Sequence, residues 1–192
     1  MSALPQAQLS YLALGDSYTI GEGVDEKDRY PFQLVDELNK VGKFNFEAPQ
    51  IIAKTGWTVD ELEAGINASQ TDKKGYDLVT LLIGVNNQYR GRPVAEFEKD
   101  FEAMLKRAIA FARGKNDHVI VVSIPDWGVT PFATSRGTDK VKVAGEIDAY
   151  NQAKKTFGYS KTNDWLNPGF IQSGNHPVVC VNWYDAQEYV GW

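Results

Sequence analysis

The chain has 192 residues, of which 43% are hydrophobic and 23% charged, and its formal net charge at pH 7 is −5. This composition is typical of a globular domain with a sizeable core. An acidic chain lacks the basic face that phosphate binding requires, so nucleic acid is not an expected partner. No apolar run is long enough to span a bilayer, and no membrane partner is expected.

The counts of cysteine and histidine limit the chemistry further. Cys180 is the only cysteine, so no disulfide within the chain is possible. One cysteine and two histidines are too few ligands for a zinc-type cluster. We therefore expect neither a metal nor a cofactor. The N-terminal residues have no cationic start and no apolar core. This predicts that there is no signal peptide and that the protein is cytoplasmic.

Four short apolar runs of strand length follow one another along the chain. They are YLAL at 11–14, IIA at 51–53, LVTLLIG at 78–84 and VIVVSI at 119–124. Each run is continuously apolar and does not alternate with polar residues. This is typical of strands that are buried on both faces of a parallel sheet.

Helical patterns separate the four runs. Pro31 suits the first turn of one helix, and Thr58 with Glu61 reads as a capping box that opens a second. The longest helix is predicted after Pro93, and another over residues 139–157. Alternating strands and helices predict an α/β fold with right-handed crossovers.

Three polar segments follow the first three predicted strands, at the point where each strand ends. They contain Ser17, Gly56 and Asn86. Ligands of parallel α/β sheets bind outside the carboxyl ends of the strands, so these residues are expected on one rim. A hydroxyl, a backbone N–H and an amide are the groups of a serine nucleophile beside an oxyanion hole. Each segment alone is more often a plain turn, a tight connection or a helix cap than part of a site, and it is their joint placement that favours a site.

Aromatic and basic residues lie in the same predicted loops. Trp57, Tyr89 and Trp127 are candidates for a substrate-binding wall that contacts an acyl or sugar group, and the alternative is that they are partly exposed rim aromatics. Arg90 and Arg92 either bind an acidic group of a substrate or pair with local carboxylates.

The segments GDSYTIGEG, TGWTVDEL and LLIGVNNQYRG resemble, in this order, the first three motif blocks of the SGNH (GDSL-type) hydrolase family. The resemblance covers about residues 9–155. It implies a flavodoxin-like three-layer α/β/α fold with a central parallel sheet, and hydrolysis of small-molecule esters without a metal or cofactor. It further implies that Ser17 is the nucleophile and an N–H donor, that Gly56 donates its N–H, and that Asn86 donates from its side chain. Asp16 would be a structural turn residue.

A serine nucleophile needs a base, but no segment of this sequence matches the family's block that supplies it. The family's last block is Asp-x-x-His, but Ser173 stands where the aspartate before His176 is expected. His118 begins the fourth predicted strand, which places it at the amino edge of the sheet, roughly 20 Å from the rim. His176 reaches the rim only if the apolar run after it forms an antiparallel edge strand.

The last part of the chain resembles a different family. The segments DWLNPGF and HPVVCVNWYDAQEYVGW are similar to a fragment of the formylglycine-generating enzyme (sulfatase-modifying factor) fold. The fragment lacks that family's catalytic cysteines, so the resemblance implies none of its activity, and Cys180 is expected in a buried strand. The sequence therefore predicts a hydrolase-type domain over residues 1–157 with its C-terminal portion truncated or replaced, and an atypical tail over residues 158–192.

Three functions follow from these observations. The first is a metal-independent esterase of the SGNH type, whose activity depends on a base from the tail. The second is a non-catalytic remnant in which Ser17, Gly56 and Asn86 bind an acyl carbonyl or a small anion. The third is an interaction protein that uses the aromatic-rich tail. The oligomeric state does not follow from the sequence.

Overall fold

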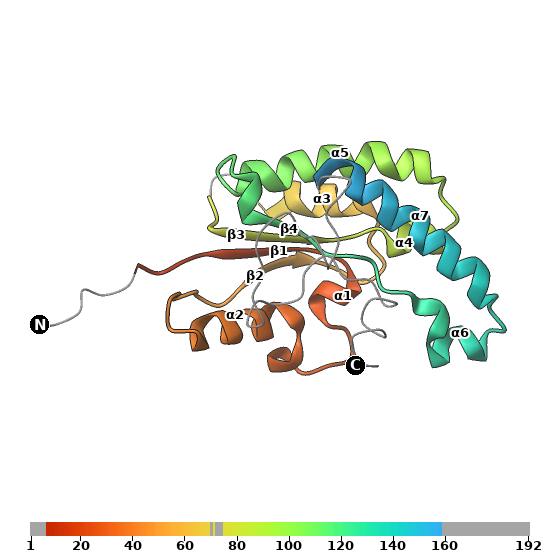
Figure 1. Cartoon of the computed structure of the whole chain (residues 1–192), viewed down its shortest axis with the longest axis horizontal. Coiled ribbons are helices and arrows are strands. Elements are labelled where there is room, and N and C mark those ends of the chain that lie inside the picture. The colour runs from red at the N-terminus through yellow and green to blue at the C-terminus, as the bar shows by residue number, and fades with distance from the viewer. Residues whose placement is uncertain (1–6, 70, 72–74, 159–192) are drawn as a thin grey trace, which may run out of the picture.

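Four parallel strands form a sheet in the order β2-β1-β3-β4 (Figure 1). The computed structural model describes residues 7–69, 71 and 75–158. The strands lie where the apolar runs predict them, which confirms the parallel sheet. They are β1 (Tyr11–Gly15), β2 (Gln50–Ala53), β3 (Leu78–Leu82) and β4 (Val119–Val121).

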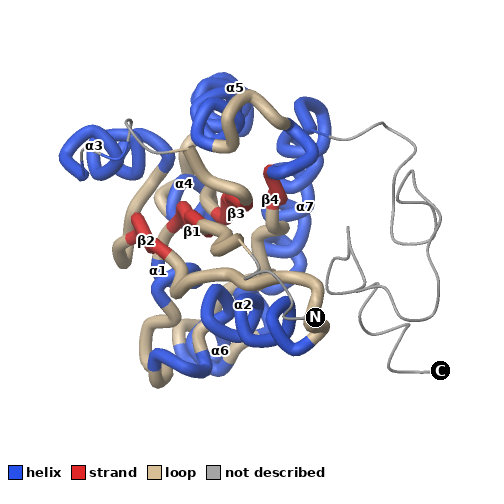
Figure 2. The backbone as a smooth tube through the Cα atoms, turned by 90° about the vertical axis from the view of Figure 1, so that its left-hand side faces the viewer, coloured by secondary structure: helices blue, strands red, loops and turns tan. Residues whose placement is uncertain are grey.

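Helices cover both faces of the sheet and give the expected α/β/α sandwich, which Figure 2 shows end-on. One layer contains α2 (Tyr30–Lys40), and the other contains α3 (Val59–Ser69) and α5 (Val94–Phe111). The last described helix, α7 (Lys140–Gly158), packs against α5 on the side of β4. Each of these four helices was predicted from its apolar spacing.

Three short helices were not predicted because four or five residues carry too little periodicity to be recognised. They are α1 (Ser17–Ile20), α4 (Val85–Tyr89) and α6 (Pro131–Ser135). The first two begin within three residues of the ends of β1 and β3, and Figure 1 shows α1 and α4 at the same end of the sheet. Their backbone N–H groups therefore face the carboxyl edge.

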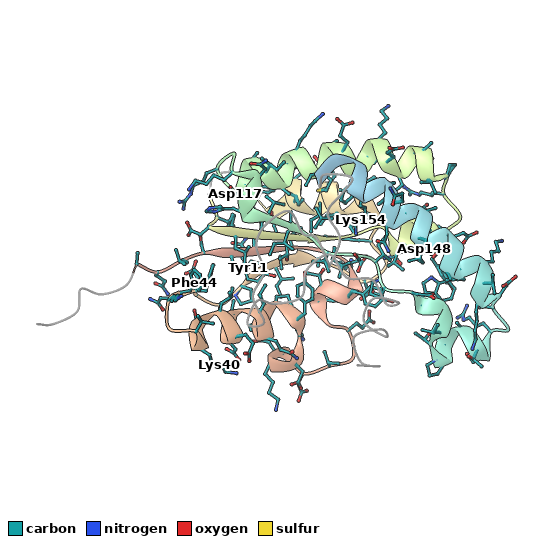
Figure 3. All side chains as sticks on the ribbon, in the orientation of Figure 1. Tyr11, Lys40, Phe44, Asp117, Asp148 and Lys154 are labelled. Atoms are coloured by element: carbon teal, nitrogen blue, oxygen red, sulfur yellow. The ribbon has the colours of Figure 1, made fainter. Side chains whose placement is uncertain are left out.

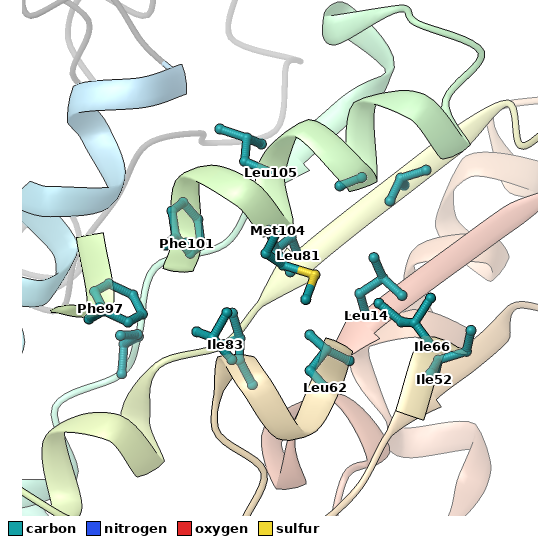
Figure 4. Packing of buried hydrophobic residues seen from close by; sticks show 14 of the residues in the cluster. Leu14, Ile52, Leu62, Ile66, Leu81, Ile83, Phe97, Phe101, Met104 and Leu105 are labelled. Carbon is teal, nitrogen blue, oxygen red and sulfur yellow. The ribbon is translucent and has the colours of Figure 1, made fainter. Parts of the chain in front are cut away.

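The core lies mainly between the sheet and the layer of α3 and α5, as Figure 4 shows. Leu14 and Leu81 from the sheet contact this layer, where Leu62, Phe97 and Phe101 are fully buried. A smaller cluster under α2 contains Tyr11, whose hydroxyl lies 2.8 Å from the Thr80 hydroxyl. The sheet is thus held from both sides, and its strand ends are fixed relative to one another.

The prediction that all four strands are buried on both faces is wrong for β4. Ile120 is 39% exposed, and its neighbours Val119 and Val121 are only half-buried. The physical reason is position, because β4 pairs with β3 alone among the described strands and lies at the edge of the sheet. None of the helices in the described part of the chain has both the length and the apolarity needed to cross a bilayer.

Candidate active site

The Gly-Asp-Ser segment turns directly from β1 into α1 and places Ser17 at the first helical position. Asp16 caps the helix, since its Oδ1 accepts a hydrogen bond of 3.0 Å from the N–H of Tyr18. Gly15 is required by close approach: a Cβ there would lie 2.0 Å from Thr19 Oγ1 and 2.4 Å from the carbonyl oxygen of Leu82. The Gly-Asp-Ser segment therefore forms a tightly packed turn that places a half-buried serine at the start of α1.

The second and third predicted segments meet beside this turn. Gly56 has a φ of +83°, which favours glycine. Asn86, in α4, donates from Nδ2 to the carbonyl oxygen of Trp57 at 2.9 Å, which joins α4 to the Gly56 turn. Thr55 in turn donates to Glu22 in the loop after α1. The three sequence-predicted segments thus lie at one edge of the sheet and are connected by side chains.

Sheet register supports the same placement. Gly15 pairs with Ala53 of β2 on one side and with Leu82 of β3 on the other. The three strands therefore end level with one another, and Ser17, Gly56 and Asn86 follow these ends within four residues. Parallel strands lie about 4.8 Å apart, so the segments that leave them are close neighbours.

Several donors on this rim have no partner within the described part of the chain. Within the described ranges, no acceptor is bonded to the N–H of Ser17 or of Gly56, and no side chain is bonded to the Ser17 hydroxyl. One of the two Nδ2 hydrogens of Asn86 is used on Trp57, which leaves the other. The neighbouring Asn87 is fully committed to structure, because its Oδ1 accepts from the N–H of Val59 and caps α3.

The rim arginines bind local carboxylates, the second of the two expectations for them. Arg90 lies 3.2 Å from Glu61 and also donates to the carbonyl oxygen of Gly56 at 2.7 Å. Arg92 lies 2.6 Å from Asp60. Both arginines therefore hold the start of α3 against α4, and their charges are already paired.

The three predicted aromatic residues have different surroundings. Trp57 is half-buried and lies over Gly65 of α3, where an added Cβ would be 2.0 Å from the indole. Tyr89 and Trp127 stack edge-on with ring centroids 5.3 Å apart, and Phe132 lies 6.0 Å from Trp127. Tyr89 and Phe132 are 48% and 47% exposed. The structure therefore joins exposed Tyr89 and half-buried Trp127 into one aromatic cluster and places Trp57 mainly against α3.

Helix α7 fixes the loops that carry this cluster. Gln88 donates to Glu146 of α7 at 2.7 Å and accepts from the Trp127 indole at 2.8 Å. Asn151 bonds to both the N–H and the carbonyl of Ile124, at 2.8 and 3.0 Å. Asn151 thus gives the backbone of the loop after β4 the hydrogen bonds that a neighbouring strand would otherwise provide, and Gln88 bonds the Trp127 side chain of the same loop.

Neither histidine provides a described base at the rim. His118 ends a short 3-10 helix, Asn116–His118, that precedes β4, so the prediction that it lies at the amino edge is confirmed. Figure 3 shows its neighbour Asp117 at this opposite end of the sheet. His176, together with Cys180 and the rest of the predicted tail from 159 onward, lies outside the described residues.

Two buried ionisable side chains, Asp16 and Lys154, lie near each other at the rim, and the sequence did not predict this proximity. Asp16 is 1% exposed, and its burial raises the pKa of the carboxyl group to about 6. Lys154 of α7 is 3% exposed, and its burial lowers the pKa of the amine to about 7, although the Asp16 charge opposes this shift. A signal was present: Val143, Ile147 and Tyr150 predict the apolar face of the helix, and Lys154 continues the same spacing.

Lys154 is expected to make the free energy of unfolding rise between pH 7 and 9. Its folded pKa of about 7 lies below its ordinary value of 10.5, so the unfolded chain binds more protons in this range. This stabilising contribution is present above the unfolded pKa and is lost as the pH falls through the folded pKa. Urea unfolding of the parent and of Lys154→Met at pH 7, 8 and 9 measures it. The variant should give a flatter profile, and parallel profiles would contradict the prediction.

The described residues contain no group of three histidine, cysteine or carboxylate side chains arranged to hold a metal ion. The chemistry that the described rim offers is therefore that of a hydroxyl, backbone N–H groups and one amide. Such a set is suited to a carbonyl group whose oxygen becomes negatively charged.

Comparison with known proteins gives a family and a fold. A family model described as the GDSL-like lipase/acylhydrolase family matches residues 13–166. The lipase/acylhydrolase from Enterococcus faecalis has a TM-score of 0.56 at 17% identity, covering 78% of this chain and 72% of that chain. An acetyl xylan esterase, AlAXEase, has a TM-score of 0.54 at 17% identity, with 77% and 73% covered.

A third solved structure, AlinE4, is described as an SGNH-hydrolase family esterase. It has a TM-score of 0.50 at 18% identity, covering 99% of this chain and 94% of that chain. No curated protein matched the sequence. At these identities the similarity to solved structures concerns the fold.

Proposed function

Because the chain belongs to the GDSL-like lipase/acylhydrolase family, we propose that it acts on small-molecule carboxylic esters through Ser17. The observation that carries this proposal is the joint position of Ser17, Gly56 and Asn86 at the ends of three adjacent strands, with Asn86 bonded to the Gly56–Trp57 turn. No step in the proposal needs a metal or a cofactor.

The proposed chemistry uses groups that the described residues leave unbonded. The Ser17 oxygen attacks the ester carbonyl carbon and gives its proton to water, and the carbonyl oxygen becomes an oxyanion. The ester C–O bond then breaks, the alcohol leaves with a proton from water, and a second water molecule hydrolyses the acyl group from Ser17. The N–H groups of Ser17 and Gly56 and the remaining Nδ2 hydrogen of Asn86 donate to it. Since these donors are held by a helix start, a tight turn and α4, they need little reorganisation when charge develops.

We propose that turnover is slow. A serine nucleophile needs a base that takes its proton and later protonates the leaving group, and among the described residues no imidazole lies at the rim. In serine proteases, the oxyanion hole and binding alone leave about 10³–10⁴-fold catalysis over water. The same observation favours the second candidate function, a site that binds an acyl carbonyl or small anion with little turnover.

The aromatic cluster is proposed to bind the substrate beside the scissile bond. Tyr89 and Trp127 are held at the rim by α4 and Gln88; Tyr89 is exposed to solvent and Trp127 is half-buried. Trp57 is proposed as a contributor through the edge that α3 leaves uncovered. Aromatic faces of this kind suit acyl chains, aryl groups or sugar rings, and AlAXEase is described as an acetyl xylan esterase.

The domain arrangement and location are also proposals. We propose a hydrolase-type domain over residues 1–157 and a tail over 158–192 related to a fragment of the formylglycine-generating enzyme fold. The family match runs on to residue 166, into the first part of this tail. A cytoplasmic location and the lack of nucleic-acid and membrane partners are proposed from composition and from the N-terminal sequence.

Hydrolysis of an activated acetate ester tests the function directly. We expect slow turnover by the full chain, loss of that turnover in Ser17→Ala, and no change in His118→Ala or His176→Ala. His118→Ala is the matched control, because it removes an imidazole at the opposite edge of the sheet. Fast turnover in the parent that collapses only in His176→Ala would show that the tail supplies the base. Turnover that is equal in the parent and in Ser17→Ala would reject the proposed function.

A further inference from the structure

Lys154 is a buried amine at the carboxyl edge of the sheet. Its Nζ donates to the carbonyl oxygen of Val122 at 2.6 Å and lies 3.5 Å from that of Ile83, so it lies across the ends of β4 and β3. The ring of Phe101 is 5.5 Å from Nζ. Figure 3 shows Lys154 between the helical layer and the sheet. An ammonium has three hydrogens, and two carbonyl oxygens account for at most two of them.

Asp16 is placed beside this amine by the sheet register. Gly15 pairs with Leu82, so the next residue, Asp16, follows β1 level with Ile83, whose carbonyl oxygen Lys154 approaches. Leu12 and Leu14 of β1 face the layer of α5, and strand alternation puts Asp16 on that same face. Its Oδ1 caps α1, whereas Oδ2 is buried and has no hydrogen-bond partner among the residues that the structure describes.

We propose that Lys154 is a positioning residue for Ser17, which acts through the positive charge that it places near the buried Asp16 carboxylate that caps the nucleophile's helix, without a direct bond to that carboxylate. A carboxylate accepts the N–H of Tyr18 more strongly than a carboxylic acid does, so the cap is firmest when Asp16 is ionised. Burial without a cation would favour the neutral acid. Below its pKa of about 7, the amine of α7 supplies the compensating charge from a part of the chain more than a hundred residues away in sequence.

The surroundings of Asp16 contain few other groups that could take this role. The other titratable residues facing it are Tyr18 of α1 and Tyr30 of α2, and the pKa of each is raised, first by burial and in part by the Asp16 charge. Both are therefore neutral near pH 7. Asp126, which faces Tyr18, is itself acidic. Among the described residues, Lys154 is the cation coupled to Asp16.

The coupling is tested first without any reference to activity. The carboxyl carbon of Asp16 is followed by NMR from pH 4 to 9 in the full-length parent, Lys154→Met and Lys142→Met, with the signal assigned by Asp16→Asn. We expect a midpoint near 6 in the parent. Removing an opposite charge at close range should raise it by about 1 in Lys154→Met. Lys142→Met is the matched control, because Lys142 is on the same helix and 71% exposed.

The reciprocal experiment keeps the proposal testable if Lys154→Met does not fold. The signal of the Lys154 side chain is titrated in the parent and in Asp16→Asn. Because coupling between two sites is mutual, loss of the carboxylate should lower the Lys154 midpoint by the same amount that loss of the amine raises the Asp16 midpoint. Unchanged midpoints in either experiment would overturn the proposal and leave Lys154 as a ligand of strand carbonyls alone.

The consequence for Ser17 rests on the proposed esterase function and is measured separately. The rate of covalent labelling of Ser17 by an alkyl fluorophosphonate is followed by intact mass between pH 5 and 9. We expect the midpoint of the rate profile to follow the Asp16 midpoint, and so to move upward in Lys154→Met and not in Lys142→Met. A shifted carboxyl midpoint with an unshifted rate profile would overturn the positioning role. No labelling in any variant would reject the esterase function, while the NMR titrations still decide the coupling.

Discussion

Asn86→Ala is expected to slow the reaction of Ser17 with an activated phosphonate by about 10²–10³-fold, the usual effect of losing one oxyanion donor. The side chain is held by its bond to the Trp57 carbonyl, which fixes the direction of the remaining Nδ2 hydrogen. A donor fixed in advance stabilises a developing charge more than one that must be ordered. Single-turnover labelling measured by intact mass is suited to this test, because it does not require the enzyme to regenerate.

Asn86→Asp is the matched variant for this prediction. It keeps the shape of the side chain and removes the donor, so it should lose as much as Asn86→Ala. Thermal unfolding of both variants separates this loss from a displacement of α4, because the bond to Trp57 is also removed in each. A loss below about threefold with an unchanged fold would mean that Asn86 does not contact the reacting oxygen.

Gly15→Ala is expected to lower the free energy of unfolding by about 3 kcal/mol, at the upper end of the range for overpacked sites. The new Cβ would overlap both Thr19 and the carbonyl oxygen of Leu82. Thr19 belongs to α1 and Leu82 to the paired strand β3, so neither is a flexible side-chain end that moves aside at low cost. The turn that carries Ser17 must therefore shift, and labelling of Ser17 should fall with stability.

Gly145→Ala gives the opposite expected sign for the same chemical change. Gly145 lies in α7, it is exposed, and an added Cβ there meets nothing within 4 Å. Alanine is the better helix former, so the substitution should stabilise the protein by about 0.5–1 kcal/mol. Urea unfolding of both variants gives the comparison. Equal effects at the two positions would show that Gly15 is not limited by space.

The sheet and the placement of the rim were predictable because short-range patterns determine them. Continuous apolar runs end at Leu14, Ala53 and Gly84, and each end is followed by a turn or short helix. Parallel strands bring such ends to one edge whatever the details of packing. The family motifs then distinguish Asn86 from the adjacent Asn87. The structure explains the difference, because the side-chain oxygen of Asn87 accepts the N–H of Val59 at the start of α3.

Other features depend on tertiary contacts that no local pattern contains. The exposure of Ile120 follows from the edge position of β4, and the Arg90 and Arg92 pairings follow from how α3 meets α4. Lys154 stands on the apolar face of a predicted helix, but its burial becomes informative only when the sheet register puts Asp16 beside it. Sequence spacing locates such a residue, and only the fold identifies its partner.

The contacts of α7 also bear on the order in which the protein acquires its structure during synthesis. The strands β1, β2 and β3 and the turns after them lie within the first 90 residues, so they leave the ribosome well before α7. Gln88 of α4 and Ile124 in the loop after β4 are bonded to Glu146 and Asn151 of α7. A nascent chain can therefore pair its central strands early, as N-terminal segments generally do. The bonds of α7 to α4 and to the loop after β4 can form only later, when this helix has been synthesised and docks.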